Sequence, residues 1–274
     1  MEFVKAIWSI LWRVSLFLIS WGLLYAPFII PVRKYLEEQD SVKSIPLRLY
    51  MESMGMISII IASLIMVSFV EHKPFWYLGF SPKNMMKDSF MGILLGSGIF
   101  IISIILLWVL GYLKLYREGE IIWSVLLLSG IAMLLNTITQ ELLVRGYIFQ
   151  VIRENFGVLA SIILSSMIFS ILHLSSAKGN ILAMLNIFLI GVLFGYTRAV
   201  TDGLWMPIGI HFAWNFLLGP VIGLTVSGKE LTNSWRFFTL QGPNIFSGGN
   251  FGIEGGLSTT FSIVIFLILL YKIL

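Results

Sequence analysis

The chain has 274 residues, of which 58% are hydrophobic and only 12% are charged. Soluble domains carry about twice that share of charge, so these side chains are too few to cover a water-soluble globule. The composition excludes a soluble enzyme or nucleic-acid binder and predicts an integral membrane protein. The net charge of +4 is attributed to Lys and Arg residues in the loops, which set the orientation of membrane-spanning helices. No nucleic-acid partner is therefore expected. The chain has no cysteine, which excludes disulfides, Cys-ligated metals and thiol nucleophiles.

Eight apolar segments approach or exceed the length of about 20 residues that a membrane-spanning helix needs. In chain order they are 4–30, 47–70, 89–112, 121–149, 158–174, 181–200, 204–226 and 257–271. Backbone amides cannot remain unpaired in lipid, and the alternation typical of transmembrane strands is absent, so helices are predicted. The first segment lacks a small-residue cleavage site and is expected to be retained. The polar, glycine-rich segment 227–256 is predicted to be an ordered surface loop. We therefore expect an all-α integral membrane protein with one transmembrane domain over residues 1–274.

Polar side chains within the apolar segments are the candidate functional residues, because polar groups at mid-membrane are costly. The fourth segment carries Gln140, Glu141 and Arg145. Glu141 and Arg145 are four residues apart with the acid first, which favours an ion pair on a helix. The plain interpretation is a neutralising pair that lets a charged helix enter the membrane. Gln140 points about 100° away from Glu141, and a lone buried Gln usually serves as an interhelical contact.

Two of the three histidines also lie within apolar segments. Phe169 and His173 are one helical turn apart in the fifth segment, and His211 and Asn215 are one turn apart in the seventh. A single intramembrane histidine is more often a hydrogen-bonded packing residue than a catalyst. Three helices that each offer one polar cluster are nevertheless explained more simply by one shared site. His72 lies in a charged loop and is expected to be solvated.

Two chemistries fit such a site. Two histidines and a carboxylate could hold zinc. Alternatively, a carboxylate and a histidine activate water as a general base while the second histidine and an asparagine donate to the oxyanion. This second scheme is acyl hydrolysis without a metal. The sequence contains no GxSxG, HExxH or P-loop motif.

The three polar clusters resemble the motifs of the CAAX protease and bacteriocin-processing (CPBP, or Abi) family of intramembrane proteases, which includes the type II CAAX prenyl endopeptidases. The family pattern EExxxR, FxxxH and HxxxN/D stands here as Gln140-Glu141-xxx-Arg145, Phe169-xxx-His173 and His211-xxx-Asn215. Each motif alone is short, but three in order on separate apolar helices are specific. The loop Glu254-Gly255-Gly256 is similar too, and the resemblance covers about residues 75–260. It implies a bundle of about eight transmembrane helices around a conical polar cavity.

The resemblance also implies a role for each motif residue. The first Glu of EExxxR and His173 would activate the attacking water, and Glu141 would pair with Arg145 to order the site. His211 and Asn215 would form the oxyanion hole. No metal or other cofactor is implied, with zinc as the alternative. The expected partners are a peptide or protein substrate, with or without an attached lipid, and the membrane lipid itself.

Gln140 departs from the family pattern, because it stands where the first Glu is expected. A carboxamide cannot accept a proton near neutral pH, and loss of a general base typically costs about 10²–10⁴-fold in rate. The chain as it stands is therefore expected to be nearly inactive. The other motif residues are intact, which favours a deliberate Glu-to-Gln replacement, with a natural variant as the alternative.

Two other functional classes were weighed against a protease. A non-catalytic membrane scaffold or a bacteriocin self-immunity protein of the same fold would explain Gln140, but not the intact His173, His211 and Asn215. A transporter would predict inverted repeats, which are absent from the sequence.

Eight spans would place both termini on one side of a multi-pass protein. Basic residues divide almost evenly between the two sides, so the positive-inside rule does not fix the orientation. We take the cavity to open at the face that carries the turns 150–157 and 198–204, which is also the face of the termini. The family resemblance implies that this face is cytoplasmic.

Overall fold

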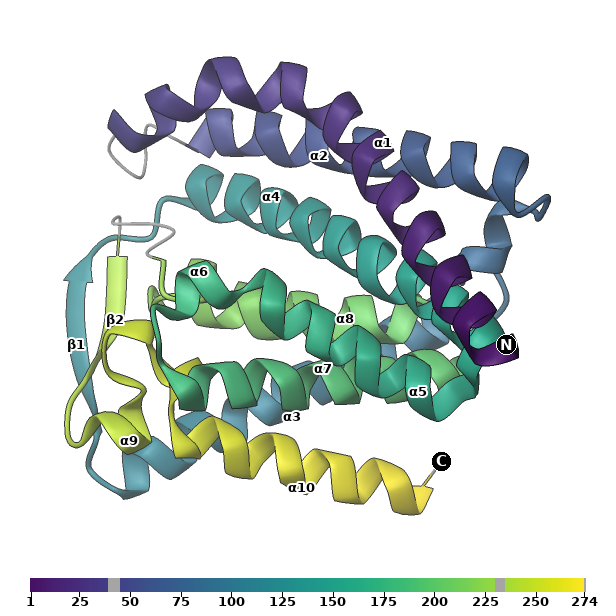
Figure 1. Cartoon of the computed structure of the whole chain (residues 1–274). Coiled ribbons are helices and arrows are strands. Elements are labelled where there is room, and N and C mark those ends of the chain that lie inside the picture. Colours follow the sequence, from purple (N-terminus) through teal and green to yellow (C-terminus); the bar gives the residue numbers. More distant parts are fainter. Residues whose placement is uncertain (39–44, 230–234, 274) are drawn as a thin grey trace.

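The computed structural model describes residues 1–38, 45–229 and 235–273 and shows a bundle of long apolar helices (Figure 1). The α-helices are α1 (Glu2–Glu38), α2 (Ile45–Ile65), α3 (Met85–Val109), α4 (Trp123–Glu141), α5 (Phe149–Leu172), α6 (Leu174–Ala177), α7 (Ile181–Thr201), α8 (Trp205–Phe216), α9 (Asn244–Ser247) and α10 (Leu257–Ile273). π-Helical segments continue three of them, at Met66–Val70, Leu142–Ile148 and Leu217–Val221. Single 3₁₀ turns occur at Phe75–Leu78, Gly249–Phe251 and Ile253–Gly255.

The predicted all-α membrane bundle is confirmed, but the count of eight spans is not. Within the described ranges, 5 helical segments are long and apolar enough to cross a membrane: Glu2–Val32, Ile45–Val70, Met85–Val109, Trp123–Leu172 and Ile181–Thr201. The fourth of these merges two predicted spans across Gly157, whose φ of 80° and ψ of −179° are non-helical and suit glycine. α8 and α10 have 12 and 17 residues, fewer than the roughly 20 that a span needs.

A small antiparallel sheet joins two loops at the end of the bundle away from the chain termini (Figure 1). β1 (Leu113–Gly119) pairs with β2 (Trp235–Leu240), with Leu113 opposite Leu240 and Gly119 opposite Trp235. The loop predicted after α8 is therefore partly a strand. Neither strand is predicted from the sequence, because runs of 7 and 6 residues carry too little alternation to stand out from a loop.

Glycines hold α8, which carries two candidate site residues, against α3. A Cβ atom on Gly92 would lie 2.3 Å from the Met206 carbonyl oxygen, and one on Gly209 would lie 2.7 Å from that of Ser89. Only glycine allows the two backbones to come this close, and such close packing is a main source of helix association in membranes. The contact fixes the depth and the rotation of α8 in the bundle.

Replacing Gly209 by Ala should lower the unfolding temperature in detergent, because overpacking a close contact costs typically about 1–3 kcal/mol. Gly22→Ala is the matched control, since a Cβ atom at Gly22 meets nothing within 4 Å. Its unfolding temperature should equal that of the parent. Equal shifts for the two variants would show that the α3–α8 contact does not depend on glycine.

Candidate active site

Four residues singled out from the sequence line one cavity of about 620 Å³, called here the large cavity. Gln140 comes from α4, His173 follows α5, and His211 and Asn215 lie on α8. The other polar lining residues are Arg48, Glu52, Ser129, Asn136, Ser175, Ser176, Ser227 and Lys229. The three helices that carry the motifs therefore meet at one cavity.

The large cavity opens at the end of the bundle that carries β1 and β2. Its lining includes Ile45 at the start of α2, Ser176 just after α5, and the exposed Lys229 in the loop after α8. The chain termini lie at the opposite end (Figure 1). The expectation that opening and termini share one face is therefore wrong. The position of a residue along its helix predicts that both histidines lie inside the bundle. It does not predict at which end of the bundle the surrounding side chains leave the cavity open.

Glu141 is fully buried beside the cavity wall, where it contacts two partners. Its Oε1 lies 3.5 Å from Arg145 Nη1 and 2.8 Å from His211 Nδ1. Arg145, equally buried, donates from Nη2 to the Gly191 carbonyl oxygen (3.1 Å), and its guanidinium lies 4.3 Å from the centroid of the Phe169 ring. The predicted pair of Glu141 and Arg145 is present in the structure. The contact with His211 was not predicted.

Each of the two site histidines has one ring nitrogen fixed by an acceptor. His173 Nδ1 lies 2.8 Å from the Phe169 carbonyl oxygen, which can only accept, so Nδ1 carries the proton. His211 Nδ1 likewise faces the Glu141 carboxylate, and the ring stacks on Phe194 with 5.0 Å between centroids. In both rings Nε2 is the nitrogen left for water or a substrate.

Asn215 carries a buried amide that has no hydrogen-bond partner among the described residues. Its side chain is 6% exposed and makes no hydrogen bond within the described part of the chain. A buried polar group left unsatisfied costs about 1–3 kcal/mol. Because Asn215 lines the large cavity, its partners would be water or a bound ligand.

Gln140 belongs to a chain of hydrogen bonds that ends on a second intramembrane acid. Gln140 Nε2 donates to Asn136 Oδ1 (2.6 Å), and Asn136 Nδ2 donates to Glu52 Oε2 (2.9 Å). Gln140 Oε1 is buried without a partner among the described residues. Sequence reasoning missed Glu52, although a lone acid inside an apolar segment is the signal that should have marked it.

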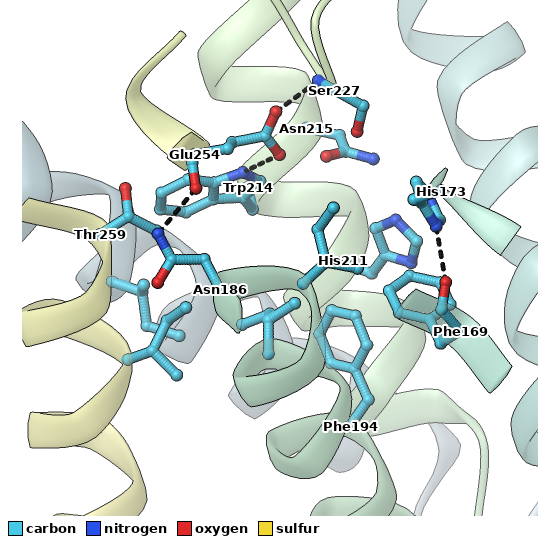
Figure 2. Close-up of a pocket in the computed structure, with 14 residues that line it drawn as sticks. Phe169, His173, Asn186, Phe194, His211, Trp214, Asn215, Ser227, Glu254 and Thr259 are labelled. Atoms are coloured by element: carbon cyan, nitrogen blue, oxygen red, sulfur yellow. Dashed lines mark hydrogen bonds between the residues drawn. The ribbon is translucent and has the colours of Figure 1, made fainter. Parts of the chain in front are cut away.

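A second cavity, of about 40 Å³ and called here the small cavity, adjoins the large one and shares His173, His211 and Asn215 with it (Figure 2). Its volume is enough for a few water molecules. Glu254, from the loop before α10, also lines it. Burial raises the pKa of Glu254 to about 7 from its ordinary value of 4.5.

One protein-family model matches the part of the chain that carries these residues. Residues 122–217 match the family model described as type II CAAX prenyl endopeptidase Rce1-like. The chain is therefore similar to these endopeptidases over this stretch. The match contains all three motifs and confirms the resemblance, although it covers less than the expected residues 75–260. No curated protein matches the chain.

The long apolar helices together with this match support a multi-pass membrane protein, and the match points to a protease class. The matched region includes α4, α5 and α8, the helices that carry the motif residues lining the large cavity. Among the described residues, no group of three or more His, Asp and Glu side chains is arranged as a metal site.

Proposed function

We propose that this fold serves an intramembrane endopeptidase that hydrolyses a peptide bond near the membrane surface, and that Gln140 leaves the present chain catalytically impaired. The observation that carries the proposal is the buried, unpartnered amide of Asn215 in one cavity with the two histidines. Donors that are fixed in place but unsatisfied are what a site for a developing oxyanion needs. The substrate class that fits is a peptide or protein, of CAAX type or a peptide leader, with or without an attached lipid.

In the proposed reaction, water in the large cavity attacks the peptide carbonyl carbon. A carboxylate at position 140, together with Nε2 of His173, takes the water proton. The carbonyl oxygen becomes an oxyanion that accepts hydrogen bonds from the Asn215 amide and from Nε2 of His211. The C–N bond then breaks, and the proton passes to the leaving nitrogen, giving a carboxylic acid and an amine; transfer of the acid proton to the amine leaves a carboxylate and an ammonium group.

His211 imposes a condition on this scheme. Its Nδ1 proton is committed to Glu141, so the ring can donate from Nε2 only when both nitrogens are protonated. The Glu141 carboxylate supplies the counter-charge for that form. Glu141 would thus act by orienting His211 as well as by pairing with Arg145.

The proposed mechanism uses no metal, because the site offers few free ligand atoms. His173 Nδ1 faces a carbonyl oxygen, and His211 Nδ1 and Glu141 are bound to each other. Two Nε2 atoms remain, whereas a catalytic zinc site typically has about three protein ligands. Zinc stays the alternative, with Glu52 as the further cavity-lining carboxylate.

A non-catalytic scaffold or bacteriocin self-immunity protein is the second candidate function. The observation that favours it is the bond from Gln140 Nε2 to Asn136 Oδ1, because an ionised carboxylate at position 140 has no hydrogen to donate there. Such a protein would bind a peptide in the large cavity without cutting it.

We also propose that the end of the bundle at which the large cavity opens faces the cytoplasm, which places the chain termini on the other side of the membrane.

Replacing Asn215 by Ala in the Gln140→Glu protein should lower kcat by about 10²–10³-fold, because one oxyanion donor is lost. The measurement is hydrolysis of a farnesylated and an unmodified fluorogenic peptide by the detergent-purified protein, with products located by mass spectrometry. KM should change little, since the donor acts mainly in the transition state.

The matched control is Asn155→Ala, which removes an amide that donates to the Val151 carbonyl oxygen within α5 and has no other partner in the described part of the chain. This variant should keep full activity. Undiminished kcat in Asn215→Ala would contradict the proposed oxyanion site.

A further inference from the structure

Glu254 is a buried carboxylate that the proposed mechanism does not use. Its Oε1 accepts from the indole nitrogen of Trp214 (3.0 Å), and its Oε2 accepts from the backbone N–H of Ser227. Within the described chain it has no ion-pair partner. Burial raises its pKa to about 7, so the carboxylate is held at a cost that the two donors only partly offset.

The loop that carries Glu254 is built to hold this side chain inward. Asn186 Nδ2 donates to the carbonyl oxygens of Glu254 (2.8 Å) and Gly256 (3.0 Å). Gly252 has a φ of 89°, and a Cβ atom there would lie 2.2 Å from Thr225 Oγ1. A loop with only a connecting role has no need of a buried carboxylate with its own supporting bonds, so a task for the carboxylate itself is indicated.

The two donors to Glu254 lie beside residues of the active site. Trp214 directly precedes Asn215 on α8, and Ser227 lines both cavities. Figure 2 shows Glu254, Ser227 and Asn215 grouped at one end of the small cavity, with the two histidines beside them.

The end of α8 needs such an anchor. Just after Asn215, α8 gives way to the π-helical segment Leu217–Val221, and π-helical turns shift the rotation of the residues around them. A contact that fixes the Trp214 indole therefore also fixes the direction of the Asn215 and His211 side chains. The edge-on packing of Trp214 against Phe100 supports the same position.

We propose that Glu254 is a positioning residue of the active site, which binds Trp214 and Ser227 and thereby holds the Asn215 amide toward the catalytic cavity. The inference rests on the proposed function and adds to it a residue from outside the three motifs. Its role is exerted through Trp214 and Ser227, without contact with the substrate.

The test is a double-mutant cycle in the Gln140→Glu protein with Glu254→Gln, Trp214→Phe and both together. Gln at position 254 keeps one acceptor oxygen, and Phe at position 214 removes the indole donor. Each single variant should lower kcat about tenfold and change KM by less than about twofold. The kcat of the double variant should be no lower than that of the less active single variant, because both substitutions break the same contact. Glu118→Gln, in the exposed part of β1, is the matched control and should leave kcat unchanged.

The outcomes separate this inference from the proposed function. An inactive Gln140→Glu parent would overturn the proposed function and the inference with it. An active parent whose kcat is unchanged by Trp214→Phe or Glu254→Gln would overturn the inference alone. A fall in unfolding temperature without a fall in kcat would also overturn it, because the contact would then be structural only. If Glu254→Gln does not fold, Trp214→Phe decides, since it leaves the carboxylate in place.

Discussion

Replacing Gln140 by Glu is expected to raise the rate of peptide hydrolysis by about 10²–10⁴-fold, the usual contribution of a general base. The other residues implied by the motifs are in place around the large cavity, so the substitution would supply the missing proton acceptor. The measurement is hydrolysis of a fluorogenic peptide by the parent and the variant in the same detergent. The glutamate would lie beside Asn136, whose Oδ1 now accepts from Gln140 and whose Nδ2 donates to Glu52. An ionised glutamate has no hydrogen to donate to Asn136 Oδ1, so this bond would be lost.

The control for this gain is Gln241→Glu, which makes the same substitution at an exposed position outside the cavity. It should leave the rate at the parent level. A folded Gln140→Glu protein that binds peptide but cuts no faster than the parent would favour the scaffold function. Such a result would also indicate that glutamine is the natural residue at position 140, where it donates a hydrogen bond to Asn136.

Replacing Arg145 by Ala is expected to lower the free energy of unfolding by about 3–5 kcal/mol, the usual cost of leaving one buried charge uncompensated. Glu141 would lose its guanidinium partner in a fully buried position, and the guanidinium contacts with Phe169 and Gly191 would be lost. Thermal unfolding in detergent measures the change. Activity in the Gln140→Glu background should fall too, because Glu141 also orients His211.

Two comparisons sharpen this prediction. Arg153→Ala breaks a pair with the largely exposed Asp202 and should cost only about 0–1 kcal/mol. The double variant Glu141→Gln, Arg145→Met removes both charges and should be more stable than Arg145→Ala alone. Equal destabilisation by Arg145→Ala and Arg153→Ala would contradict the prediction, because the buried pair of Glu141 and Arg145 would then contribute no more to the free energy of unfolding than an exposed pair does.

The sequence predicted those features that follow from the cost of polar groups in lipid. Spacing alone paired Glu141 with Arg145, and the expense of burying polar side chains predicted that His173, His211 and Asn215 share a cavity. These inferences succeed because they depend on local helix geometry and on a large energetic penalty.

Features that depend on tertiary packing could not be predicted in the same way. The contact of Glu141 with His211 joins α4 to α8, and the inward position of Glu254 depends on a loop shaped by glycine and held by Asn186. The open end of the cavity depends on which side chains fill each end of the bundle. None of these leaves a periodic pattern in the sequence.

The proposed chemistry is tested most directly by the metal content and chelator response of the purified Gln140→Glu protein. The value of kcat/KM is measured before and after extraction with a chelator, and bound zinc is determined on the same samples. We predict substoichiometric zinc and an unchanged kcat/KM, with activity lost in a variant that also carries His173→Ala. One zinc per chain, with activity lost on extraction and restored by added zinc, would contradict water activation by residue 140 and His173 alone.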